Sequence, residues 1–191
     1  MRIFYISDSH HGHFNVIRYD NRPFSSVEEM DDEQIRRWNS VVTPEDIVYI
    51  LGDFSWYKED KTLEILDKLN GRKVLIKGNH DRISPKVAKK FEKREEYLEI
   101  QDGDERVILS HYPIPFWNGQ FRDTVHLYGH VHNSHQYNYC MNIRKELAQL
   151  QDIPMRMFNV GAMMPYMDYT PRTLQEILEA NAEVINNESK K

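Results

Sequence analysis

Short apolar runs alternate with amphipathic stretches along the first half of the chain. The apolar runs at 2–6, 47–51 and 74–76 have the length of buried strands. Between them, apolar residues recur at helical spacing over 30–42 and 63–69, which predicts a helix after each of the first two strands. This alternation of strands and helices favours the α/β class.

The second half of the chain departs from this alternation. Segments 97–101 and 106–110 are predicted as strands, and Asp102-Gly103-Asp104-Glu105 between them predicts a hairpin turn. A hairpin next to strand–helix units favours mixed sheets, in which some neighbouring strands are parallel and others antiparallel. The remaining predicted elements are strands at 125–128 and 157–160 and an amphipathic helix from Thr173 to about 186.

Length and composition fit a single domain spanning residues 1–191. Hydrophobic residues make up 40% of the chain and charged residues 29%, a balance typical of globular rather than disordered proteins. Cys140 is the one cysteine, which excludes an internal disulfide framework and any cysteine-rich zinc module.

The net charge and the lengths of the apolar runs exclude further classes of protein. A formal charge of −5 argues against a non-specific binder of nucleic acid or of membrane surfaces. No apolar run approaches the roughly 18 residues that span a bilayer. The apolar run at 2–6 is shorter than the h-region of a signal peptide, so the expected location is the cytoplasm.

The nine histidines are clustered in the sequence. They stand at positions 10, 11, 13, 80, 111, 126, 130, 132 and 135, and the stretches 14–79 and 136–191 hold none. Clustered histidines in a chain with a single cysteine favour a metal site with nitrogen and oxygen ligands.

Five predicted strands end in Asp, Asn or His. In open α/β sheets, ligands bind beyond the carboxyl ends of the strands, so these side chains are expected to share one crevice. A lone Asp or His at a strand end is more often a turn or capping residue, but five such ends are hard to obtain by chance. The expected metal ligands are Asp8, His10, Asp53, Asn79, His111, His130 and His132.

The spacing of these residues adds to the metal hypothesis. Asp8 with His10, and His130 with His132, stand two residues apart, so each pair can point to one side of an extended segment. Small residues precede several of the ligands and permit close backbone approach, namely Gly52, Gly78 and Gly129. Seven ligands are too many for one tetrahedral zinc, but they suit two metals about 3.5–4 Å apart that share a carboxylate.

Taken in order, the motifs resemble those of the calcineurin-like metallophosphoesterase superfamily. They are Asp8-x-His10, Gly52-Asp53, Gly78-Asn79-His80-Asp81, the lone His111 and Gly129-His130-x-His132. The opening segment 7–13 and the motif Asn21-Arg22-Pro23-Phe24 further resemble a group of small bacterial and phage phosphoesterases.

The resemblance implies a four-layer αββα sandwich with two mixed β-sheets and a dinuclear metal site at the strand ends. Carried over by position, the first metal is held by Asp8, His10 and His132, and the second by Asn79, His111 and His130. Asp53 then bridges the two metals. His80 matches the family's catalytic histidine near the leaving group, and Asp81 matches the carboxylate that orients this histidine.

The function expected from this resemblance is hydrolysis of a phosphomonoester or phosphodiester by a hydroxide that bridges two divalent metal ions. His80 would act as general acid toward the leaving group. Manganese is the preferred metal, with iron, zinc or nickel as alternatives. The substrate is a small phosphoester or a nucleotide. The sequence does not choose among monoesters, diesters, cyclic nucleotides and nucleotide pyrophosphates, and it leaves the oligomeric state open.

Two alternatives stay open at this point. The chain could be a catalytically silent scaffold for protein interaction, although all the expected metal positions and His80 count against this. It could also be a nuclease for short single strands, since the acidic charge disfavours long duplexes. Trp56, Tyr112 and Trp117 follow motifs and could stack a base, but ordinary packing is an equally good interpretation.

Overall fold

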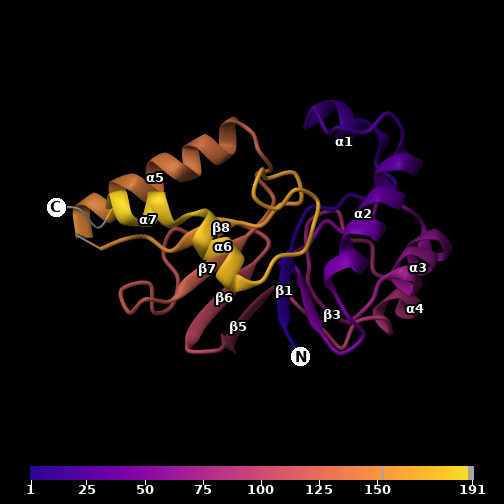
Figure 1. The fold of residues 1–191 in the computed structure, drawn as a ribbon, viewed down its shortest axis with the longest axis horizontal. Helices are drawn as coiled ribbons and strands as arrows, with labels where there is room; N and C mark the ends of the chain where they lie inside the picture. The colour runs from indigo at the N-terminus through magenta and orange to yellow at the C-terminus, as the bar shows by residue number, and fades with distance from the viewer. Residues whose placement is uncertain (152, 189–191) are drawn as a thin grey trace.

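The computed structural model describes residues 1–151 and 153–188 and places the strands in two four-stranded sheets (Figure 1). The first sheet has the order β1-β2-β3-β4, and all its neighbouring strands are parallel. Its strands are β1 (Ile3–Ile6), β2 (Ile47–Ile50), β3 (Arg72–Ile76) and β4 (Lys93–Glu95). At its β1 edge, Tyr5 forms an antiparallel bridge with Arg172.

The second sheet has the order β5-β6-β7-β8 and is mixed. The first pair of strands is antiparallel and the other two pairs are parallel. Its strands are β5 (Tyr97–Asp102), β6 (Glu105–Ser110), β7 (Val125–Tyr128) and β8 (Met157–Asn159). The predicted hairpin is confirmed, because Asp102 pairs with Glu105 where β5 turns into β6.

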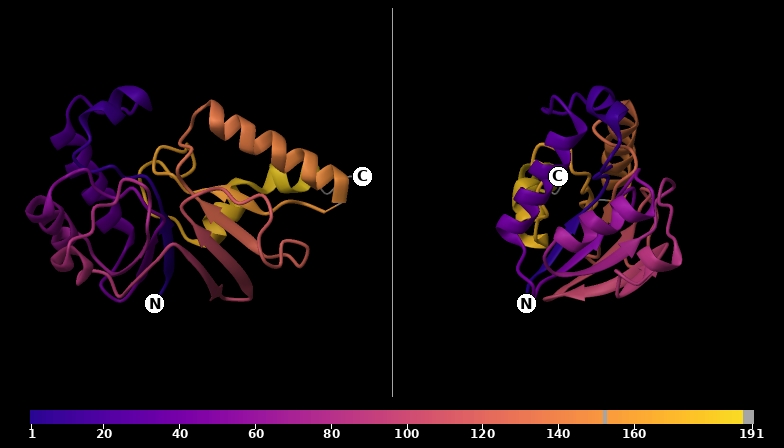
Figure 2. Two further views of the ribbon diagram at one scale, coloured as in Figure 1. Left: turned by 180° about the vertical axis from the view of Figure 1, so that it is seen from behind. Right: turned by 90° about the vertical axis from the view of Figure 1, so that its right-hand side faces the viewer.

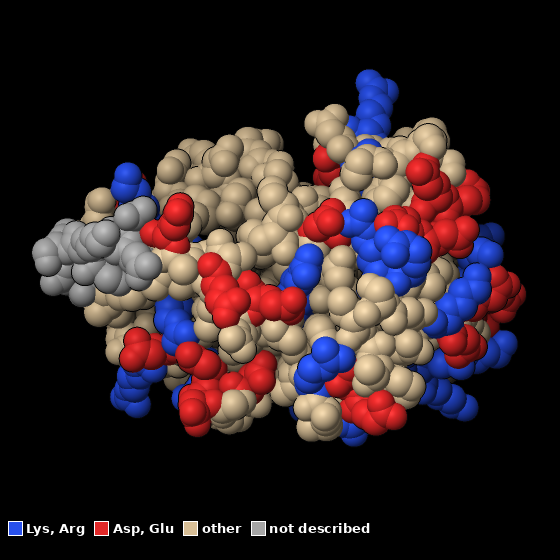
Figure 3. Space-filling view, in the orientation of Figure 1, with Lys and Arg blue, Asp and Glu red and all other residues tan. Residues whose placement is uncertain are grey.

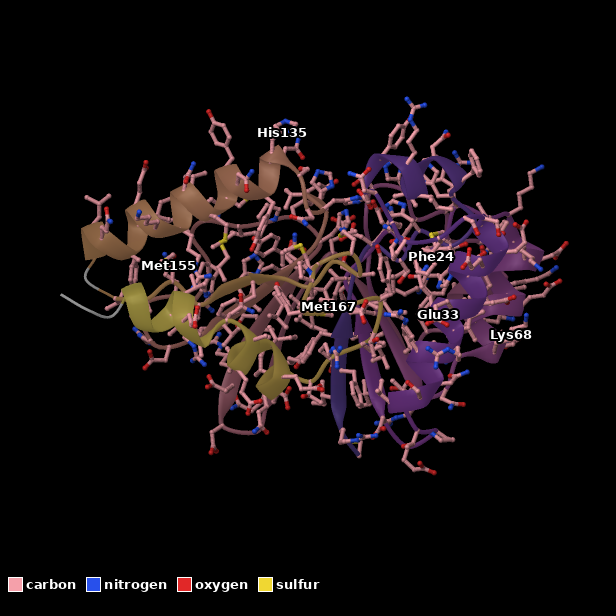
Figure 4. All side chains as sticks on the ribbon, turned by 45° about the horizontal axis from the view of Figure 1, so that its top comes forward. Phe24, Glu33, Lys68, His135, Met155 and Met167 are labelled. Carbon is pink, nitrogen blue, oxygen red and sulfur yellow. The ribbon has the colours of Figure 1, made fainter. Side chains whose placement is uncertain are left out.

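Helices cover the outer sides of both sheets, which gives the predicted four-layer sandwich (Figures 1 and 2). Beside the first sheet lie α1 (Phe14–Tyr19), α2 (Val27–Val41), α3 (Glu59–Lys68) and α4 (Pro85–Ala88). On the side of the second sheet lie α5 (His135–Gln151), α6 (Leu174–Ala180) and α7 (Ala182–Glu188). Within residues 1–151 and 153–188, none of these helices is long and apolar enough to cross a membrane.

One apolar core joins the two sheets. It contains buried side chains such as Ile50 from the first sheet and Leu109 and Leu127 from the second. Side chains that alternate with these on the second sheet, including Ile108, face a smaller cluster that is closed by Ala148 of α5. Strand β7 and most of β6 are therefore buried on both faces of the second sheet.

Side chains cap the starts of two helices. Thr173 and Glu176 form a complete reciprocal cap at the start of α6. At the start of α2, the Ser26 side chain accepts from the Glu29 N–H at 3.1 Å, and the Glu29 carboxylate accepts from the Ser25 N–H at 2.7 Å. Both helix starts therefore have a backbone N–H satisfied by a side chain.

The C-terminal helix differs from the prediction of one helix to about residue 186. The chain forms α6 and α7 with a break at Asn181, whose amide Nδ2 donates to the Ile177 carbonyl oxygen at 2.8 Å. Asn181 is buried at this break, and its side chain caps the last turn of α6. An Asn at a helix end competes for backbone partners in this way and stops the first helix.

A buried histidine outside the strand-end crevice makes stability depend on pH. His126 of β7 accepts from the Ile114 N–H at 3.0 Å, and its Nδ1 lies 3.2 Å from the Ile108 carbonyl oxygen. Burial lowers the pKa of this ring to about 4. Since the unfolded-state pKa is about 6.5, the unfolded chain binds the proton more readily. The stability contributed by this group is therefore lost as the pH falls from about 6.5 to about 4.

We expect the His126 ring to account for a loss of about 3 kcal/mol in the free energy of unfolding between pH 7 and pH 4. Urea unfolding across this range measures it. The His126→Gln variant should show a shallower dependence, whereas His135→Gln, at an exposed position, should keep the wild-type dependence. An unchanged pH dependence in His126→Gln would contradict the assignment.

Candidate metal centre

The seven predicted ligands come from the carboxyl ends of five strands and meet at one end of the sandwich. Asp8 and His10 follow β1, Asp53 follows β2, Asn79 follows β3, His111 follows β6, and His130 and His132 follow β7. The two sheets are joined at this end by a parallel bridge between Ser7 and Gly161. The site therefore lies where the two sheets meet, and each sheet supplies part of it.

The first set of ligand atoms surrounds a space of the size of one ion. His10 Nε2 lies 3.1 Å from His132 Nε2, and Asp8 Oδ1 lies 3.5 Å from the latter and 4.0 Å from the former. Ligands about 2.1 Å from a common metal ion are separated by roughly 3–3.5 Å. The three atoms have nearly this spacing.

The second set is built around the Asn79 side chain. Its Oδ1 lies 2.9 Å from His130 Nδ1 and 3.1 Å from His111 Nε2. Asp53 Oδ2 lies 3.6 Å from His111 Nε2 and 3.7 Å from His10 Nε2. One carboxylate oxygen of Asp53 is thus nearly equidistant from the two sets.

The hydrogen bonds of two histidines direct their Nε2 atoms into the centre. His111 Nδ1 lies 2.7 Å from the Leu51 carbonyl oxygen, and His132 Nδ1 lies 2.8 Å from an oxygen of Asp20. Both Nδ1 atoms face acceptors and therefore carry a proton, so Nε2 is the nitrogen that each ring can offer to a metal ion. The two Nε2 atoms face oxygen atoms of Asn79 and Asp8 at 3.1 and 3.5 Å. A metal ion here would take the place of a proton between the imidazole nitrogen and the oxygen.

The backbone at the ligands is unusual and corrects one step of the sequence argument. Five of the seven positions have left-handed φ values, which are 54° at Asp8, 52° at His10, 50° at Asp53, 70° at His130 and 49° at His132. The expectation that each i, i+2 pair lies on an extended segment is therefore wrong. The side chains converge because the chain turns sharply after each strand, in a region that non-glycine residues seldom occupy and that is often found at functional sites.

Two glycines bring the ligand loops into contact, as the sequence predicted. A Cβ added at Gly78 would lie 2.3 Å from Asp53 Oδ1, and one at Gly129 would lie 2.4 Å from Asp8 Oδ2. Any side chain at either position would displace a carboxylate of the site. Small residues are needed here because the loops pack against the ligands themselves.

A buried carboxylate and a buried arginine support His132, and sequence reasoning missed both roles. Asp20 accepts from His132 Nδ1, and its Oδ2 accepts from Arg22 Nε at 3.0 Å and Nη2 at 2.9 Å. Arg22 also donates to the carbonyl oxygens of Asp8 and Ser9, each at 2.9 Å. This chain of contacts fixes the ring orientation of one ligand and the backbone of the loop that carries another.

Replacing Asp20 by Asn is expected to weaken metal binding by about 10- to 100-fold, because a ligating imidazole loses the carboxylate that holds its orientation. Isothermal titration with Mn²⁺ measures the affinity directly. Asp67→Asn, which removes an exposed carboxylate paired with Lys90, serves as the control and should bind like the wild type. Wild-type affinity in Asp20→Asn would show that Asp20 is not part of the site.

The charges in the centre favour a bound cation. Burial opposes ionisation of Asp8, but contacts with His132 outweigh burial and hold the pKa of this carboxyl below its usual range. Burial also opposes the charged form of His132, yet Asp20 and Asp8 raise its pKa to about 9. The carboxylates around this ring therefore stabilise positive charge, which a metal ion would supply.

For three further predicted ligands, burial is the largest influence on the pKa. Burial raises the pKa of Asp53, and it lowers the pKa of the His10 and His130 rings. The two histidines are therefore neutral at pH 7, the form in which imidazole binds metals.

The two predicted catalytic residues have different surroundings. His80 is exposed, and its backbone N–H donates to Asp53 Oδ1 at 2.9 Å. That Asp81 orients His80 stays a prediction from the resemblance, and the hydrogen bonds of Asp81 give it a further role. The Asp81 carboxylate accepts from the backbone N–H groups of Asp53, Phe54 and Gly78 at 2.8–3.0 Å. Asp81 therefore ties the loop after β3 to the loop after β2, a use of Asp that the motif does not reveal.

Of the aromatic residues next to the motifs, some are packed in the interior and others lie beside the site. His11 turns away to Asp31 of α2, with its Nδ1 3.0 Å from Oδ1. Trp117 is buried in the smaller apolar cluster. Trp56 and Tyr112 are exposed beside the ligands. Packing is therefore the right interpretation for Trp117.

Residues 1–178 match the family model described as the calcineurin-like phosphoesterase superfamily domain. The chain belongs to this superfamily. Membership in this superfamily supports a hydrolase that acts on phosphoester bonds. Members of the superfamily normally bind divalent metals. The two acidic and histidine groups at the centre, Asp8–His10–His132 and Asp8–Asp53–His111, are of the kind that such metals require.

Several relatives share most of this calcineurin-like chain. The uncharacterized protein MJ1445 of Methanocaldococcus jannaschii is 39% identical over 140 residues, which cover 72% of this chain and 73% of that protein. The gene 66 protein of mycobacteriophage D29 is 30% identical over 159 residues, covering 69% and 78% of the two chains. A solved structure of a protein of unknown function, AQ665 from Aquifex aeolicus, has a TM-score of 0.71 and 27% identity, covering 93% and 98%.

Proposed function

We propose that this protein hydrolyses a phosphomonoester or phosphodiester at a pair of divalent metal ions. The observation that supports the proposal is the convergence of imidazole nitrogens from loops of both sheets on carboxylate and amide oxygens at 3.1–3.5 Å. Asp8, His10 and His132 would hold one ion, and Asn79, His111 and His130 the other. Asp53 would contact both. Manganese, iron, zinc and nickel suit this nitrogen–oxygen set, whereas copper(I) prefers sulfur ligands.

The ligand charges favour an anionic substrate. Two divalent ions would bring more positive charge than the Asp8 and Asp53 carboxylates cancel, and the other five ligands are neutral amide or imidazole groups. The centre would then attract a phosphate although the whole chain carries a formal charge of −5. Bound divalent ions lower the pKa of water and stabilise charge on phosphoryl oxygens.

In this proposal His80 acts on the leaving group. Its exposed ring stands on a backbone that is fixed by the hydrogen bond to Asp53. Its ring centroid lies 5.9 Å from that of His10 and 4.7 Å from that of Trp56. A ring at this distance can donate a proton to an ester oxygen that leaves from a phosphate held over Asp53. Asp81 acts indirectly, by fixing the loops that carry Asp53 and His80.

Hydrolysis of bis-p-nitrophenyl phosphate tests this function. We expect EDTA to abolish the activity and Mn²⁺ to restore it, because the proposed chemistry needs the metal pair. Metal content measured on the same samples should fall and recover in parallel. Activity that survives complete chelation would contradict the metal mechanism. A metal-loaded protein that is inactive on all simple phosphoesters would instead favour the silent scaffold.

A further inference from the structure

Two exposed aromatic rings flank the candidate metal centre, one beside each set of ligands. Trp56 lies next to His10 and His80, and Tyr112 lies next to His111 and His130. We propose that these two rings stack planar groups on the two ester arms of the substrate, which is then a phosphodiester joining two nucleosides. This inference rests on the proposed phosphoesterase function and specifies its substrate class.

Trp56 is held as a rigid platform on the His80 side. Its indole stacks on the His13 ring with centroids 4.2 Å apart and planes 9° apart, and its backbone N–H donates to the His11 carbonyl oxygen at 2.8 Å. Even so, 41% of the residue is exposed. A ring that is fixed on one face and still open to solvent needs little reorganisation to receive a base.

Tyr112 forms the corresponding wall on the other side. Its ring centroid lies 4.6 Å from that of His130 and 5.1 Å from that of His111, and 47% of the residue is exposed. It lines a cavity of about 500 Å³ together with Lys77, Asn79 and Glu96. Because Asn79 is also a proposed metal ligand, this cavity opens directly from the centre.

Folding does not account for these two rings, in contrast to the other tryptophans. Trp38 and Trp117 are 2% and 6% exposed, and their indole N–H groups donate to the carbonyl oxygens of Asn70 and Thr124 at 3.0 and 3.2 Å. In the part of the chain that the structure describes, the Trp56 indole N–H has no such partner. Large rings left open beside a polar site are typical of ligand contact.

The placement of the two rings relative to Asp53 favours a diester. Asp53 Oδ2 lies 3.7 Å from His10 Nε2 and 3.6 Å from His111 Nε2. Trp56 is 6.4 Å from His10, and Tyr112 is 5.1 Å from His111, measured between ring centroids. A phosphate above Asp53 would therefore have an aromatic wall toward each set of ligands. A monoester has one organic arm and would use one wall, whereas a diester between nucleosides would use both.

The charge in the Tyr112 cavity indicates which kind of arm it receives. Lys77 is the only cation among its lining residues, and it is opposed by Glu96 and by the buried Asp81. This balance offers no excess positive charge for a second phosphate group. A neutral nucleoside fits it better than the diphosphate of a nucleotide pyrophosphate.

The test compares two diesters with the same leaving group, methyl p-nitrophenyl phosphate and thymidine 5′-(p-nitrophenyl phosphate), with Mn²⁺ present. Stacking of one base contributes about 1–3 kcal/mol, so we expect kcat/KM to favour the thymidine ester by roughly 5- to 150-fold. Tyr112→Leu should remove most of this preference, measured as the ratio of kcat/KM for the two esters on the same sample of the variant. Phe121→Leu, which removes an exposed ring from the loop before β7, should keep the wild-type preference.

The stacking role of Trp56 is tested by a binding measurement that does not depend on turnover. Thymidylyl-(3′→5′)-thymidine should quench the emission of Trp56, the most exposed of the three tryptophans, and Trp56→Leu should raise its dissociation constant, measured by titration calorimetry, at least fivefold. If the wild type cleaves the methyl ester but shows no thymidine preference, or if Tyr112→Leu keeps that preference, the inference is wrong and the phosphoesterase function stands. If no ester is cleaved at all, the proposed function itself fails.

Discussion

Asp53→Asn should lose tight binding of the metal pair and, with it, more than about 100-fold in phosphodiester hydrolysis. The loss should exceed the 10- to 100-fold typical of residues that merely orient a ligand, because Asp53 would contact both ions. The substitution keeps the shape of the side chain but removes the negative charge that lies 3.6–3.7 Å from two imidazole nitrogens. An amide NH₂ group in that position would repel a cation.

Metal content after gel filtration, measured together with titration calorimetry, decides this prediction. The Asn oxygen can still accept the His80 N–H, so the loop should keep its conformation. Asp67→Asn removes an exposed carboxylate and should retain the wild-type metal content. An Asp53→Asn protein that keeps two tightly bound ions would remove Asp53 from the bridging position.

His80→Gln is expected to spare metal content and slow turnover by about 10²- to 10⁴-fold for esters with alkyl leaving groups. An alkoxide must take up a proton as it leaves, and in the proposed mechanism the His80 ring donates it. The effect on nitrophenyl esters should be much smaller, because nitrophenolate is a weak base and departs without protonation. Equal losses for the two kinds of ester would argue against proton donation by His80.

Metal content serves as the internal control for His80→Gln. The backbone N–H that donates to Asp53 is retained in the variant, and the side chain is not one of the proposed ligands. Reduced metal binding in this variant would therefore indicate damage to the loop after β3 rather than loss of an acid. Comparing the two leaving groups on the same protein sample separates these causes.

The strand ends were predictable because they follow simple local rules. Apolar runs predicted β1, β2 and β3, and the polar residues directly after them are the ones that the structure brings together. The requirement for glycine at 78 and 129 was also visible in the sequence, since each stands directly before an expected ligand. Both inferences use only neighbouring residues and the geometry of parallel sheets.

The contacts that link distant segments could not be predicted in the same way. Asp20 and Arg22 support His132 across more than a hundred residues, and no periodicity or spacing marks such a pair. Helix α5 was missed because its inward side includes Arg144, whose guanidinium lies 5.0 Å from the Phe158 ring centroid. A charged residue at a buried position breaks the apolar stripe by which a helix is predicted.

The origin of the ligands has a consequence for the protein as a whole. Asp8, His10, Asp53 and Asn79 belong to loops of the first sheet, while His111, His130 and His132 belong to loops of the second. Two metal ions bound at this site would cross-link the two halves of the sandwich. Ion affinity and the cohesion of the halves are then thermodynamically linked, and each strengthens the other by the same free energy. Loss of the ions would therefore weaken the contact between the two sheets as well as remove the proposed activity.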